Sequence, residues 1–137
     1  MTDSPIDPTL LERLAEVSVR TGLNLQPGQE LVLTAPVTAL PLVRAITRAA
    51  YAAGASLVTP LLTDAAVTLA RVETAGDETF DLAPGWLYSG MAEAFDRGAA
   101  RMAIVGEDPM LLSEQDPAKV SRVGKATSTA YKPALEK

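Results

Sequence analysis

Three short aliphatic runs alternate with longer amphipathic segments, and this pattern restricts the fold more than any other feature of the chain. The runs lie near residues 30–35, 56–62 and 100–105. Each is short, mainly aliphatic and followed by a segment with helical periodicity, which is typical of buried parallel strands. We therefore predict an α/β fold with an open, mainly parallel three-layer α/β/α sheet of the flavodoxin-like or Rossmann-like kind. The first two strands should pair in parallel through a right-handed crossover.

Aspartate–proline pairs precede several of the helical segments. Asp7-Pro8 predicts the start of a first helix that ends at Gly22, because aspartate caps helix N-termini and proline favours the first turn. Leu10, Leu14 and Val17 recur at helical spacing and are expected to be its buried stripe. Further helices are expected before Gly54, over residues 65–73, from Pro84 or Gly85 to Gly98, briefly after Asp108-Pro109, and from Asp116-Pro117 onward. Phe80, within the loop 74–84, is a candidate core anchor.

The charge distribution indicates a boundary near Asp116. Residues 1–116 carry 7 basic and 16 acidic side chains, a charge of −9, whereas residues 117–137 carry 5 basic and 1 acidic, a charge of +4. We expect an α/β domain over 1–116 and a terminal helix or linker over 117–137. The net charge of −5 argues against a nucleic-acid partner, because phosphate neutralisation needs clustered lysine and arginine. No apolar run reaches the ~18 residues of a membrane span, so a cytoplasmic protein without a membrane partner is expected.

The chain contains no histidine and no cysteine, the residues that supply most transition-metal ligands and nucleophile–base pairs. Asp64, Glu107 and Asp108 follow strands, and ligands of open parallel sheets bind beyond the carboxyl ends of the strands. These carboxylates could form a hard-metal or acid–base cluster. The alternative is that Asp64 and Asp108 cap helices.

Other candidate groups carry weaker signals. Ser89 and Ser113 have no base nearby in sequence, and Ser128 has only Lys125 within one helical turn. No glycine-rich phosphate-binding motif follows the first strand. Trp86, in the aromatic stretch 84–88, could line a binding cleft or a subunit interface, or it could pin the start of a helix to the core.

Four motifs together resemble one family. They are TGLNLQPGQ at 21–29, LAPGWLY at 82–88, IVGEDPML at 104–111 and AYKP at 130–133. In this order they resemble the N-terminal domain of the aminopeptidase T and aminopeptidase S type metallopeptidases, over essentially the whole chain. The resemblance implies cytoplasmic, homodimeric exopeptidases that remove N-terminal amino acids from peptides with two divalent metals, zinc or cobalt. It also implies that the metal ligands lie in a larger C-terminal domain, so no catalytic, cofactor-binding or metal-binding residue is assigned here.

The leading hypothesis is therefore the N-terminal, non-catalytic part of a longer metallo-aminopeptidase, which would be inactive as a fragment. A thin apolar stripe formed by Val120, Val123 and Ala130, together with Trp86, is then expected to be exposed and to favour homo-oligomers. The alternatives are a stand-alone small-ligand-binding module of α/β fold and an interaction module that docks through Trp86 and the basic last helix.

Overall fold

The computed structural model describes residues 7–105 and 115–135, with side chains described up to residue 132. These residues form two compact units. The first comprises the described residues up to Leu62 together with Gly98–Val105, and the second comprises Thr63–Arg97 and the described residues from 115 onward. The elements are α1 (Pro8–Val17), a π-helical turn (Ser18–Gly22), β1 (Glu30–Pro36), a 3₁₀ turn (Val37–Ala39), α2 (Leu40–Ala52), β2 (Leu57–Thr63), α3 (Ala65–Thr74), a 3₁₀ turn (Asp77–Thr79), α4 (Gly85–Asp96), β3 (Ala100–Ala103) and α5 (Pro117–Leu135).

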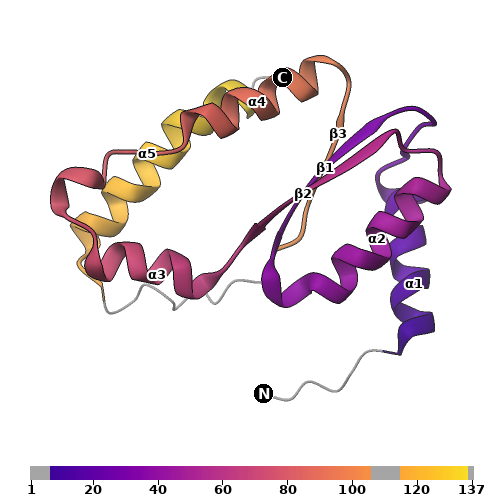
Figure 1. Cartoon of the computed structure of the whole chain (residues 1–137), viewed down its shortest axis with the longest axis horizontal. Coiled ribbons are helices and arrows are strands. Elements are labelled where there is room, and N and C mark those ends of the chain that lie inside the picture. Colours follow the sequence, from indigo (N-terminus) through magenta and orange to yellow (C-terminus); the bar gives the residue numbers. More distant parts are fainter. Residues whose placement is uncertain (1–6, 106–114, 136–137) are drawn as a thin grey trace. The chain divides into compact units, whose positions relative to one another are not determined.

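The first unit is built on a three-stranded parallel sheet (Figure 1). The strand order is β2–β1–β3, so β1 is central. β1 pairs with β3 in parallel, with Leu31 opposite Ala100 and Thr34 opposite Ala103. The α/β class and the parallel sheet predicted from the aliphatic runs are confirmed.

One face of the sheet carries the core of this unit. Leu31, Leu33 and Ala35 alternate along β1 and pack with Ile46 and Ala50 of α2. Val58 of β2 and the half-buried Ala100, Met102 and Ile104 extend the same cluster. α1 and α2 form the helical layer on this face. A second helical layer on the opposite face stays a prediction.

The predicted buried stripe of α1 is wrong. Leu10, Leu14 and Val17 are each at least half exposed, whereas Ala15 and the following Val19 are fully buried. The physical reason is the close packing of α1 on α2, because small side chains let two helix backbones approach one another. The α-helix also ends before the predicted stop at Gly22, since a π-helical turn over Ser18–Gly22 follows Val17.

Gly54 ends α2 as predicted and fits closely against the turn before β1. Its φ is +102°, and a β-carbon there would lie 3.0 Å from the α-carbon of Pro27. The Gly28 N–H donates to the Gly54 carbonyl oxygen at 2.8 Å, and the Ser56 N–H donates to that of Gln29 at 3.0 Å. These contacts hold the beginnings of β1 and β2 together, at a position where a side chain would be strained.

The second unit is helical, and α4 and α5 pack against each other in it (Figure 1). Met91 of α4 is buried. Val120, Val123 and Ala130 of α5 are half-buried, so the expectation that this stripe is exposed is wrong. These side chains are half-buried because α5 packs on α4. The brief helix expected after Asp108-Pro109 lies outside the described residues.

Candidate functional site

Asp64 is the one strand-end carboxylate that the structure describes, and it acts as a helix cap, as Asp7 and Asp116 do elsewhere. The Asp64 Oδ1 accepts a hydrogen bond from the Ala66 N–H at 3.1 Å, at the beginning of α3. The Asp7 Oδ1 does the same for Thr9 at 3.0 Å, and the Asp116 Oδ1 for Ala118 at 2.9 Å. The capping interpretation of Asp64 is confirmed, because its oxygen satisfies an amide that the helix leaves without a partner. Glu107 and Asp108 lie outside the described residues.

The serines give no geometric support to nucleophilic catalysis. Ser89, Ser128 and Lys125 are all exposed, and nothing in the described part of the chain holds Ser128 against Lys125. A serine nucleophile needs a base within hydrogen-bond reach. Ser113 lies outside the described residues.

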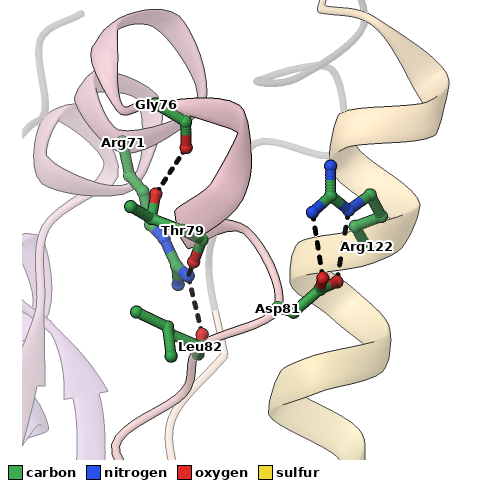
Figure 2. A network of polar contacts seen from close by, with 6 residues as sticks. All are labelled: Arg71, Gly76, Thr79, Asp81, Leu82 and Arg122. Atoms are coloured by element: carbon green, nitrogen blue, oxygen red, sulfur yellow. Dashed lines mark hydrogen bonds and ion pairs between the residues drawn. The ribbon is translucent and has the colours of Figure 1, made fainter.

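A polar network fastens the segment between α3 and α4, and Figure 2 shows it from close by. Arg71 of α3 donates from Nη2 to the carbonyl oxygens of Thr79 at 3.0 Å and of Leu82 at 2.6 Å. The Thr79 hydroxyl donates to the Gly76 carbonyl oxygen at 2.7 Å. One guanidinium therefore ties down two backbone carbonyls of an irregular segment, which would otherwise need water as a partner.

A bidentate ion pair joins the same segment to α5. Arg122 donates from Nε to the Asp81 Oδ1 at 3.2 Å and from Nη2 to Oδ2 at 2.9 Å (Figure 2). The hydrogen bond from Arg122 lowers the pKa of Asp81 and raises that of Arg122. Because the pKa of Asp81 is lowered on folding, the pair stabilises the fold above the ordinary aspartate pKa and is lost as the pH falls below it. Sequence spacing gave no signal for this pair, since the partners are 41 residues apart.

Phe80 lies beneath these charges and is fully buried. The Lys119 Nζ lies 5.7 Å from the centre of its ring, and the Arg122 Cζ lies 5.8 Å from it. Both cations are within the range at which a ring face attracts positive charge. The prediction that Phe80 anchors the loop in the core is confirmed, and the basic side chains of α5 help to cover it.

Tyr88 of α4 and Tyr131 of α5 form an edge-to-face pair with ring centres 4.9 Å apart. Burial raises the pKa of Tyr88, and the nearby Tyr131 raises it further. Folding therefore favours the neutral phenol. The resulting stability is present below the ordinary tyrosine pKa of about 10 and is lost as the pH rises through the higher pKa of the folded protein.

We predict that Tyr88 contributes a late component to an alkaline titration, above the ordinary tyrosine pKa. Followed by the near-ultraviolet absorbance of tyrosinate, the late component should disappear in Tyr88→Phe. The Tyr131→Phe variant keeps the ring contact and is the control, because it should shift this component to lower pH without removing it. An unchanged titration of Tyr88→Phe would contradict the assignment.

Trp86 does not pin α4 to the core, because the residue is 78% exposed. The core-anchor alternative for this residue is wrong, since Phe80, Met91 and the tyrosine pair fill that role. A cavity of about 560 Å³ lies between the segment 81–83 and α5, and its lining residues are Asp81, Leu82, Ala83, Arg122, Lys125, Ala126, Thr129 and Ala130. The Arg122 guanidinium at its wall is already engaged by Asp81, so the rest of the lining is apolar except for Lys125 and Thr129.

The described residues do not fit a metal. Within 7–105 and 115–135, no three side chains of histidine, cysteine, aspartate or glutamate are placed to hold an ion. None of the described helices combines the length and apolar character needed to cross a membrane.

Comparison with known proteins identifies a family over nearly the whole chain. Residues 8–137 match the sequence profile described as Thermophilic metalloprotease. Aminopeptidase T of Thermus thermophilus is 50% identical over 126 residues, covering 92% of this chain and 31% of that protein. Aminopeptidase 2 of Geobacillus stearothermophilus is 37% identical over 120 residues, covering 88% of this chain and 29% of that protein.

The fold agrees with a solved structure, described as wild-type AmpT from Thermus thermophilus, with a TM-score of 0.89. The two chains are 50% identical, and the match covers 92% of this chain and 32% of that one. The chain thus spans a little under one third of the length of the relatives it matches.

Proposed function

Because the chain belongs to the thermophilic metalloprotease family, we propose that it is the N-terminal, non-catalytic part of a metal-dependent aminopeptidase. The observation that carries the proposal is the close match in sequence and fold to aminopeptidase T. Peptides would be the substrates of the complete polypeptide. This chain would support the catalytic domain and form part of the wall of its cavity, and residues outside this chain would cleave the peptide bond.

The metal ions would belong to the remainder of the polypeptide. Two divalent ions, zinc or cobalt, would activate water and polarise the peptide carbonyl there. The absence of histidine and cysteine from this chain supports the placement of the metal ligands in the remainder of the polypeptide. No step of peptide hydrolysis is assigned to a described residue.

The proposed location, oligomeric state and partners of the enzyme follow from the same resemblance. We place it in the cytoplasm as a homo-oligomer, in keeping with the family resemblance, and the acidic net charge disfavours a nucleic-acid partner. Residues 1–116 would be the α/β part, and residues 117–137, including α5, would lead toward the catalytic part.

The test compares the isolated chain with a chimera. In the chimera, residues 8–137 replace the matching region of Thermus thermophilus aminopeptidase T. We expect the isolated chain to release no amino acid from a leucine-containing peptide with zinc, with cobalt or without metal. The chimera should release leucine, and a chelator should stop this release by removing the metal. The isolated chain should be inactive because a catalytic metal site needs about three protein ligands and an open position.

Two outcomes would contradict the proposal. One is a folded chimera that is inactive with either metal, which would favour a stand-alone binding module. The other is metal-dependent release of leucine by the highly purified isolated chain. If the Glu107→Ala, Asp108→Ala double variant then lost that activity, the strand-end carboxylates would be the metal site.

A further inference from the structure

Helix α1 has a second apolar side that nothing in the described structure covers. Leu10, Leu14 and Val17 are 58%, 50% and 53% exposed. Their spacing of four and three residues places them on one side of the helix. The buried side is occupied by Ala15 and continues to Val19. A surface helix typically has one apolar stripe, so the second stripe needs its own explanation.

This stripe continues into an apolar groove. The groove has a volume of about 440 Å³ and begins at Leu14. It runs from the end of α1 past the first half of α2 to β3, and its lining includes the apolar Leu23, Leu42, Ile46, Met102 and Ile104. Arg101 is the one charged residue in this lining. The groove is therefore suited to aliphatic side chains.

The groove ends at an outer strand of the sheet. Among the described strands, in the order β2–β1–β3, β3 has a neighbour on one side. The Ile104 N–H donates to the Thr34 carbonyl oxygen of β1 at 2.8 Å. Peptide groups of successive residues in a strand point to opposite sides, so those of Ala103 and Val105 point to the outer edge. Val105 is also largely exposed, and proteins usually cover such edges.

We propose that the groove and the outer edge of β3 receive an extended aliphatic segment from the part of the longer metalloprotease polypeptide that has no counterpart in this chain. The segment pairs with β3 as an added strand, and its inward side chains fill the groove beside Leu14. This inference rests on the proposed function, because the relatives of this chain are about three times as long.

The size of the surface favours this occupant over a second copy of the chain. α1 has 10 residues and is therefore about 15 Å long. A stable interface between separate molecules needs about 800 Å² from each partner, which three aliphatic side chains and one short strand do not supply. A segment of the same polypeptide needs less contact, because tethering raises its effective concentration.

The test uses the isolated chain and the chimera described above. Leu14→Glu should leave the melting temperature of the isolated chain nearly unchanged, since Leu14 is exposed there, and should lower that of the chimera by several degrees, since it would bury a carboxylate. Val67→Glu is the matched control, because Val67 of α3 is also exposed and lies outside the groove. It should affect neither protein. Val17→Glu, on the same stripe, is a second variant and should give the same result as Leu14→Glu.

Hydrogen exchange provides a readout of the strand itself. The amides of Ala103 and Val105 should exchange at least about tenfold more slowly in the chimera than in the isolated chain, because a paired edge opens less often. Equal exchange in both proteins, or equal effects of Leu14→Glu and Val67→Glu on the chimera, would overturn the inference. Self-association of the isolated chain that Leu14→Glu abolishes would also overturn it, in favour of a second copy.

The two proposals fail separately. An active chimera with unprotected β3 amides would remove the strand-addition inference and leave the function intact. An inactive chimera with protected β3 amides and sensitivity to Leu14→Glu would remove the proposed function and leave the docking surface.

Discussion

Replacing Phe80 with alanine should lower the free energy of unfolding of the helical unit by about 3–5 kcal/mol. Phe80 is fully buried, and its removal would leave a cavity that the flanking segment is too constrained to fill. Arg71 holds that segment through the carbonyls of Thr79 and Leu82, on both sides of Phe80. The ring also attracts Lys119 and Arg122, and this contact would be lost with it.

The fluorescence of Trp86 measures this effect, because it is the only tryptophan and lies on α4 of the same unit. Its denaturant midpoint should fall sharply in Phe80→Ala. Leu82→Ala is the control, since Leu82 is nearby in sequence but largely exposed, and its midpoint should barely move. Equal shifts in the two variants would mean that Phe80 is not the anchor of the unit.

The elements that the sequence predicted well are those that local chemistry determines. The strands formed where aliphatic runs lie between helix signals, and Asp64 and Asp116 capped the helices that directly follow them. These features depend on neighbours within a few residues. Phe80 was also predictable, because it is the one large apolar residue in the central part of a polar loop.

The buried side of α1 was not predictable from hydrophobicity. Its sequence offers two helical stripes, and the one with larger side chains, Leu10, Leu14 and Val17, is exposed. Packing of α1 on α2 favours the stripe of Ala15 instead, through backbone approach. Hydrophobic periodicity reports the presence of an apolar side, and tertiary packing decides which side is buried.

Long-range polar pairs were equally out of reach of the sequence. Asp81 and Arg122 are charged residues 41 positions apart, and nothing in the sequence indicates that they pair. Arg71 binds backbone carbonyls, which every residue has, so the amino-acid types do not reveal its partners. The functional inference has a different origin, because no described side-chain cluster carries chemistry. It came from four motifs acting together as a family resemblance, which the comparisons confirmed.

Replacing Leu33 with alanine should destabilise the sheet unit by about 2–5 kcal/mol. Leu33 is fully buried at the centre of β1, between β2 and β3, and it packs in the same cluster as Ile46 and Ala50 of α2. Neither the strand nor the helix can move inward without breaking the register in which Leu33 lies opposite Met102. The cavity should therefore persist, which places the expected loss in the upper part of this range.

Trp86 does not lie in this unit, so hydrogen exchange of the β1 and β3 amides is the appropriate measurement. Those amides should exchange faster in Leu33→Ala by a factor that matches the lost free energy, with each 1.4 kcal/mol corresponding to about tenfold. Leu57→Ala on β2 is the matched control, because Leu57 is half exposed and its truncation should change the same amides little. If Leu57→Ala accelerated exchange as much as Leu33→Ala, the core of this unit would not lie where β1 and α2 meet. A selective effect of Leu33→Ala would instead locate the stability of the sheet on the α2 side of β1.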